Sequence, residues 1–231
     1  MRTPQARLGI GGCEVLLVGT VPGFAPDGER VEQAFGAFLP DCVALGVPAE
    51  DLVVLEKLAT ADPKPELPMP DEATQRLLEL LADFGPTAIP SPDLERATAL
   101  ARGRGLALAA LDLDDAEHAT LYTKHVKFRH VVQSNSIKRR LLKDGVAGAD
   151  AYALADAWDA AWTRPKGLRE VEEARERHMA RRLHECAAEH RRILAVLPAP
   201  RLAGVLRLLQ GVPMAASPAG AEGFAAASGQ A

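Results

Sequence analysis

The sequence predicts an α/β protein with a mostly parallel sheet flanked by helices and a helical elaboration in its second half. Short apolar runs of strand length occur at residues 14–20, 41–47, 106–113 and 192–197. Segments with leucines at helical spacing lie between them. Strands that alternate with helices are typical of a parallel sheet, because each crossover needs a helix to return the chain.

The first run, EVLLVGT at residues 14–20, is the most informative segment. Its continuous apolar core predicts a buried strand, and the turn Val21-Pro22-Gly23 ends it. A helical pattern follows at residues 27–38. An open α/β sheet builds its ligand sites at such strand–turn–helix junctions, at the carboxyl ends of the strands. The Thr20 hydroxyl is the one polar side chain of this turn, so Thr20 is a candidate ligand-binding residue.

The remaining elements follow from leucine spacing, capping residues and proline. Residues 49–59 carry Leu52, Leu55 and Leu58 on one helical face, and Asp71 caps a helix that runs to residue 84. The proline-rich stretch 60–70 predicts an extended connector. Further helices are expected from Asp93 to about residue 103 or 105, at 118–142, around Trp158 and Trp162, at 165–190 and at 200–209.

These elements predict one domain over residues 1–212, with the helical elaboration at 115–190 and a disordered tail at 213–231. The net charge of −4 gives no general attraction to nucleic acid or anionic membranes. The three scattered cysteines fit a reducing compartment. The N-terminal segment lacks the apolar core of a signal peptide. We therefore expect a cytoplasmic protein with neither a membrane nor a nucleic acid as its partner.

Two aspartates, Asp112 and Asp114, follow the third predicted strand. A carboxylate pair at a strand end can hold a cation or polarise a ligand. Alternatively, either Asp114 or the neighbouring Asp115 caps the next helix, and Asp112 accepts hydrogen bonds within a loop. The histidines at 178, 184 and 190 recur every six residues, so they point in different directions from one helix and do not predict a metal site.

A basic run between residues 124 and 143 is the strongest charge feature. It could bind an anionic partner such as nucleic acid, an acidic protein face or a phosphorylated ligand. The alternative, which we prefer on sequence grounds, is a solvated helix face balanced by the acidic residues at 170–176. The anion-binding candidates are Lys124, Lys127, Arg129, Lys138, Arg139 and Arg140.

Five segments, read together over about residues 14–210, resemble the TraB family, which includes Tiki-like and GumN-like proteins. They are GTVP at 19–22, PDCVALG at 40–46, LDLD at 111–114, ARERHMA at 174–180 and PAPRLAG at 198–204. The family patterns for these places are GTAH, PDVVAVE, DRD, ERDxxMA and GAGHLxG. The resemblance makes Arg175 the match of the family's helix arginine. Arg175 then either reaches an anionic ligand or lies in a surface charge ladder.

The resemblance implies that hydrolytic members use two histidines and a glutamate with a divalent metal. At those positions this chain has Pro22, Arg201 and Gly46, and Leu113 stands between the two aspartates. Proline and glycine offer no side-chain ligand, and arginine is a permanent cation. Arg201 therefore joins the ligand-binding candidates, and no catalytic or metal-binding residue is predicted.

We expect a non-catalytic TraB-like domain, a pseudoenzyme that acts as a binding or regulatory module without a cofactor. A homodimer is expected, because the helical excursion offers surface for pairing. The alternatives are a divergent hydrolase that holds Mn²⁺ or Co²⁺ around Asp112 and Asp114, and a protein that binds anions through residues 124–143. The sequence does not identify the ligand or the partner.

Overall fold

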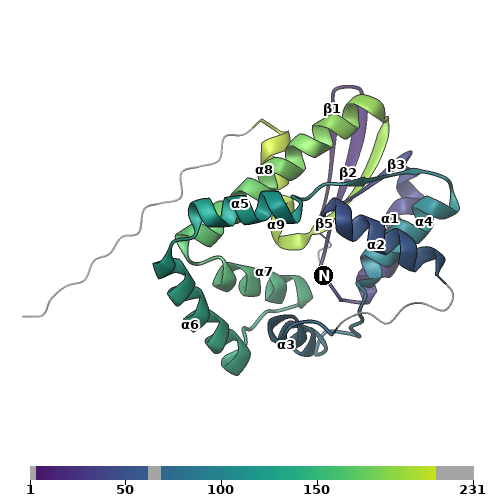
Figure 1. Cartoon of the computed structure of the whole chain (residues 1–231). Helices are drawn as coiled ribbons and strands as arrows, with labels where there is room; N and C mark the ends of the chain where they lie inside the picture. Colours follow the sequence, from purple (N-terminus) through teal and green to yellow (C-terminus); the bar gives the residue numbers. More distant parts are fainter. Residues whose placement is uncertain (1–3, 62–68, 212–231) are drawn as a thin grey trace, which may run out of the picture.

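A five-stranded sheet organises the chain (Figure 1). A computed structural model describes residues 4–61 and 69–211. The strand order is β1-β2-β5-β3-β4, in which β1 is antiparallel to β2 and the other neighbours are parallel. The strands are β1 (Gln5–Ile10), β2 (Cys13–Thr20), β3 (Cys42–Leu45), β4 (Ala107–Ala110) and β5 (Arg192–Pro198). The predicted class, α/β with a mostly parallel sheet, is confirmed.

Strand β1 is the element that the sequence-based prediction omits. Its apolar residues Ala6, Leu8 and Ile10 alternate with more exposed ones, because only one face of this edge strand packs on the core. β1 therefore lacks a continuous apolar run. The alternation of apolar and exposed residues with a period of two was the signal that could have predicted this strand. Gly11, at a φ of 57°, begins the two-residue turn that pairs β1 with β2.

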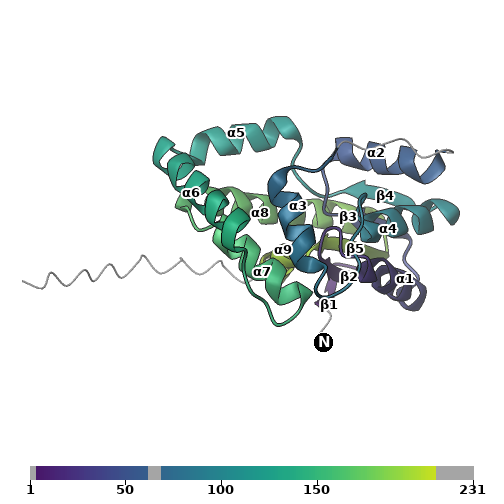
Figure 2. The same ribbon diagram turned by 90° about the horizontal axis from the view of Figure 1, so that it is seen from below.

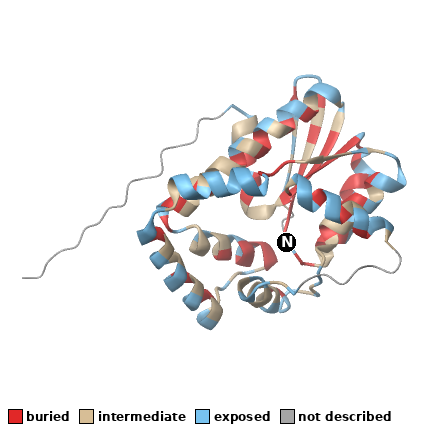
Figure 3. Cartoon of the chain, viewed as in Figure 1, coloured by how far each residue is buried: buried red, intermediate tan, exposed pale blue. Residues whose placement is uncertain are grey.

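Helices cover both faces of the sheet (Figures 2 and 3). On one face, Val18 and Val43 pack with Phe35 of α1, and on the other Leu17 packs with Met179 of α8. Strand β5 lies between β2 and β3, and its residues 193–197 are all buried. The first layer consists of α1 (Pro26–Phe38), α2 (Ala49–Thr60) and α4 (Pro92–Gly103), and the second of α8 (Lys166–Glu189) and α9 (Ala199–Leu209).

A third group of helices gathers beside the carboxyl ends of the strands (Figure 1). Ile137 and Leu141 of α6 pack with Trp158 of α7 and Leu77 of α3. Val21, immediately after β2, is buried in a neighbouring apolar cluster that includes residues of α3 and α7. These helices therefore cover the edge of the sheet where the candidate site is expected. The helices are α3 (Glu72–Leu81), α5 (Asp115–His125), α6 (Phe128–Asp144) and α7 (Ala151–Trp162).

The expected single helix at 118–142 is wrong, since α5 and α6 are separate helices. Val126 and Lys127 have extended backbone conformations between them. The Lys127 N–H donates to His130 Nδ1 over 3.2 Å, which satisfies one donor at the start of α6. No glycine or proline marks this break in the sequence. Three other expected elements are shorter than predicted: β3 ends at residue 45, β4 at residue 110 and α3 at residue 81.

Two expected segments fall largely or wholly outside the described residues. The connector at 60–70 lies mostly, and the tail at 213–231 entirely, outside the described residues. Within residues 4–61 and 69–211, no helix combines the length and apolar character that crossing a bilayer requires.

The three cysteines are buried and unpaired, and burial raises the pKa of the Cys42 thiol to about 12. Such thiols are poor nucleophiles at neutral pH.

Candidate functional site

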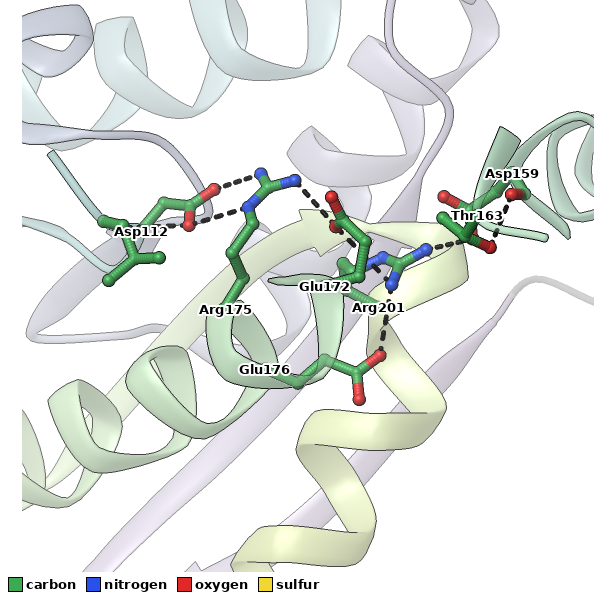
Figure 4. A network of polar contacts seen from close by, with 8 residues as sticks. Asp112, Asp159, Thr163, Glu172, Arg175, Glu176 and Arg201 are labelled. Carbon is green, nitrogen blue, oxygen red and sulfur yellow. Dashed lines mark hydrogen bonds and ion pairs between the residues drawn. The ribbon is translucent and has the colours of Figure 1, made fainter. Parts of the chain in front are cut away.

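A network of ion pairs lies at the carboxyl edge of the parallel strands (Figure 4). Arg175 of α8 and Arg201 of α9 supply its positive charges. Its carboxylates come from the loop after β4, from α7 and from α8, and they are Asp112, Asp159, Glu172 and Glu176. Residues far apart in the sequence thus meet where an open α/β sheet forms its ligand sites.

Asp112 and Arg175 form one end of the network. Both carboxylate oxygens of Asp112 accept hydrogen bonds from the guanidinium, one from Nε over 3.1 Å and one from Nη2. The backbone N–H of Leu113 donates to the same carboxylate over 2.8 Å. Arg175 Nη1 also donates to Glu172 over 2.7 Å. Asp112 is therefore fully engaged by protein donors, and a cation bound there would have to displace Arg175.

Arg201 forms the centre of the network. It lies in the first turn of α9, directly after β5, and its side chain is only 8% exposed. Its Nη2 donates to Asp159, and its Nη1 lies 3.4 Å from Glu176 and 3.6 Å from Glu172. One guanidinium thus holds carboxylates from two different helices, α7 and α8.

The network carries more negative than positive charge. Two guanidinium groups face four carboxylates, a formal excess of two negative charges. Burial raises the pKa of Asp159 and of Glu176, and Arg201 only partly opposes this. Burial alone would lower the pKa of Arg175, but the hydrogen bonds and charges of Asp112 and Glu172 outweigh it and raise that pKa. The carboxylates of the network lack part of the positive charge that would balance them.

A cavity of about 510 Å³ opens beside this network. The N-terminal half of α3, the end of α7 and the first turn of α9 form its walls together with α6 and α8. Its lining residues are Asp71, Ala73, Thr74, Leu77, Lys138, Trp158, Asp159, Trp162, Glu172, Arg175, Pro198, Pro200 and Arg201. The lining combines two indole side chains with charged groups, a mixture typical of small-molecule sites.

The structure brings together three of the five predicted ligand-binding residues, Asp112, Arg175 and Arg201. Asp114 instead caps α5: its carboxylate accepts from the Glu117 N–H over 2.7 Å, and the Glu117 carboxylate accepts from the Asp114 N–H over 3.3 Å. The capping alternative for Asp114 is confirmed. Arg175 lies in the network, not in a surface charge ladder.

Thr20 belongs to a second buried polar cluster, after β2. Its hydroxyl lies 3.4 Å from the Leu197 carbonyl oxygen. Nearby Asp93 is buried at the start of α4, and burial raises the pKa of this carboxyl, while the hydroxyls of Ser91 and Thr20 partly oppose the shift. The Gly23 N–H donates to the Ser91 hydroxyl over 2.7 Å. These contacts fasten the turn after β2 to α4.

Sequence reasoning missed the other carboxylates of the network. Glu172, Arg175 and Glu176 are spaced i, i+3 and i+4, so they share one face of a helix, and this spacing was the available signal. Asp159 has no comparable signal, because only the packing of α7 places it near Arg201. Lys138, predicted as part of an anion-binding face, lines the cavity instead.

The fold and the network define an open α/β protein with an ion-paired cavity at the carboxyl edge of its sheet. Scans of the sequence against models of known protein families and against curated proteins gave no match. Among residues 4–61 and 69–211, no three His, Cys, Asp or Glu side chains are arranged to hold a metal ion.

Gly204 of α9 packs directly against the network, and we predict that Gly204→Ala lowers stability. A Cβ atom there would overlap the Glu176 carboxylate, which is buried and has Arg201 as its partner. Overpacking of this kind costs about 1–3 kcal/mol. In Gly36→Ala on α1, the new methyl group meets nothing within 4 Å, so that variant should gain about 0.5–1 kcal/mol. Urea unfolding of both variants checks the opposite signs.

Proposed function

We propose that this chain is a non-catalytic TraB-like α/β domain that binds a small ligand carrying a positively charged group, such as an amine or a guanidinium. The excess negative charge of the Arg175–Arg201 network is the observation that carries the proposal, since Asp159 and Glu172 of that network line a cavity of about 510 Å³. The ligand would act as the regulatory or recognition signal of the domain.

The side chains at the family's catalytic positions support a non-catalytic role. Arg201 stands where the resemblance expects a histidine, and three carboxylates hold its guanidinium. Gly46 stands where a glutamate is expected, and a Cβ there would lie 2.9 Å from Pro198 Cδ, so the backbone leaves no room for a longer side chain. Asp112 is neutralised by Arg175. Hydrolysis needs an acid or base with an oxygen that is not held by another protein group. The side chains at these three positions offer no such oxygen.

The three carboxylates and three cations that line the cavity balance formally, so the excess negative charge of the adjoining network is what favours a cationic ligand over an anionic one. The two arginines are already bound by carboxylates, so an anion would have to compete with Asp112, Asp159 and the two glutamates. Helix ends of both signs meet at the wall, since α3 and α9 begin there and α7 ends there. The Asp71 carboxylate caps α3, and the C-terminus of α7 offsets the partial charge of about half a unit at the start of α9. Trp158 and Trp162 add aromatic surface, which attracts cations.

Calorimetric titration of the full chain with spermidine and with L-arginine methyl ester tests this proposal. We expect stoichiometric binding that weakens with salt, and mass spectrometry should recover both probes unchanged. Lys138→Glu replaces a cation on the cavity wall with an anion and should raise the affinity about three- to tenfold. Lys57→Glu, an exposed position on α2, is the matched control and should leave the affinity unchanged.

Sulfate and succinate serve as anionic probes. Tighter binding of these anions than of the amines would overturn the cationic ligand class. Chemical conversion of a probe would overturn the non-catalytic assignment, as would stoichiometric Mn²⁺ or Co²⁺ binding that is lost in Asp112→Ala.

A further inference from the structure

The outer side of α6 carries an unusual combination of exposed cations and exposed apolar side chains. We call this surface the cationic face and define it by Lys124, Lys127, Phe128, Arg129, Val132, Arg139, Arg140 and Lys143. All eight residues are exposed, and they lie at the end of α5 and along α6 (Figures 1 and 3).

Helical geometry explains why these residues share one side. His130, Ile137 and Leu141 are buried against the protein. At about 100° per residue, Phe128, Val132, Arg139 and Lys143 fall on the opposite side of α6, and Arg129 and Arg140 lie on the adjoining flank. The face is therefore apolar near the start of α6 and cationic near its end, with Lys124 and Lys127 beside the apolar part.

The positive charge of the face is not neutralised within the described part of the chain. None of its six lysines and arginines forms an ion pair with another described residue. Three of the four acidic residues at 170–176 have other partners: Glu170 contacts Lys166 and His125, the latter within the basic run, while Glu172 and Glu176 belong to the Arg201 network. The face is exposed to solvent, as the preferred interpretation expects, but its six cations have no ion pair with the acidic residues at 170–176, and the whole-chain charge of −4 hides a local positive excess.

The apolar part of the face narrows the choice of partner. The Phe128 side chain is 83% exposed and Val132, one turn later, is 50% exposed. Pairing two copies through this face would bring like charges together. Proteins that bind single-stranded nucleic acid use grooves, whereas this face is the outer side of a peripheral helix (Figure 2). An anionic bilayer uses both components, because its headgroups attract cations and its acyl boundary accepts an aromatic ring.

We propose that the cationic face docks the protein peripherally on an anionic lipid bilayer. Lys127, Arg129 and the cations near the end of α6 contact the phosphate headgroups, and Phe128 inserts at the boundary with the acyl chains. The cavity beside Arg201 takes only Lys138 from α6, and Lys138 is not part of the cationic face, so docking is independent of the function proposed above.

Flotation of the full chain with lipid vesicles tests this proposal. We expect binding to phosphatidylcholine vesicles that contain about one third phosphatidylglycerol, weak binding to pure phosphatidylcholine, and loss of binding as salt rises. Each basic residue near a membrane contributes about fivefold, so Arg139→Glu/Arg140→Glu should lower the partition coefficient at least about 25-fold. Phe128→Ser should lower it about tenfold.

The matched control is Lys57→Glu/Arg191→Glu, which reverses two exposed cations outside the face and should leave binding within about twofold of the wild type. Thermal unfolding checks that all variants fold. Equal binding to both kinds of vesicle, no binding to either, or an equal loss in the control would overturn the proposal. So would salt-sensitive binding to a DNA or RNA oligonucleotide in the absence of vesicle binding.

Discussion

Arg201→Met should lower the free energy of unfolding by about 3–5 kcal/mol at pH 7.5, the cost of breaking a buried ion pair on one side. Methionine has a similar length but no charge, so Asp159, Glu172 and Glu176 would lose their shared cation. A domain has only about 5–15 kcal/mol of stability, so this single change would remove a large part of it. Chemical denaturation with urea measures the loss.

The effect of Arg201→Met should depend on pH in a defined direction. In the wild type, burial already raises the pKa of Asp159 and Glu176, and losing the guanidinium raises both further. The folded variant then binds protons at pH values where the same carboxyls of the unfolded chain are ionised. Its stability therefore falls as pH rises through this window, so the deficit should be smaller at pH 5 than at pH 7.5.

Arg191→Met is the matched control for this prediction, because Arg191 is exposed and lies outside the network. It should change stability by no more than about 0.5 kcal/mol. Equal losses in the two variants would show that the network contributes nothing through Arg201. A deficit that grows toward pH 5 would contradict the assigned charge excess.

Asp27→Ala should also cost about 3–5 kcal/mol, because it removes a fully buried carboxylate and leaves its donors, among them the half-buried Arg30, without their partner. The Asp27 carboxylate is fully buried at the start of α1 and accepts from the Val21 N–H over 2.7 Å, from Arg30 over 2.7 Å and from the Tyr152 hydroxyl. One side chain thus joins the turn after β2 to α1 and to α7. Thermal and urea unfolding measure the loss.

Glu29→Ala is the control for Asp27→Ala, since Glu29 is an exposed acid in the same first turn of α1. We expect it to cost less than about 1 kcal/mol, the size of a helix-dipole effect. Tyr152→Phe should remove one of the three bonds and fall between the two variants. If Asp27→Ala were as stable as Glu29→Ala, the buried carboxylate would have no structural role.

Local sequence signals identified most of the fold because they act over a few residues. The apolar runs predicted four of the five described strands, and Asp71 caps α3 through the N–H groups of Ala73 and Thr74 as expected. The same approach omitted β1, whose edge position leaves only one face buried, and it joined α5 to α6, because no residue type marks the break at Val126.

The candidate site was predicted in part. Asp112, Arg175 and Arg201 were named individually, but the sequence left their roles open. Their meeting depends on where β4 and β5 end and on how α8 lies across the sheet. Asp159 and the two tryptophans of the cavity come from α7, whose position is set by packing with α3 and α6. Nothing in the local sequence specifies that packing.

By itself, the sequence determined the α/β class and the chain order of most elements. It also determined the positions at which residues without metal-binding side chains stand in place of the ligands expected from the TraB resemblance. These properties follow from apolar periodicity, capping and residue chemistry, which act locally. Only the tertiary structure decided which charges neutralise one another. It placed the acidic residues of α8 against Arg201 and left the cations of α6 exposed, because ion pairing depends on distance in space and on burial, not on distance along the chain.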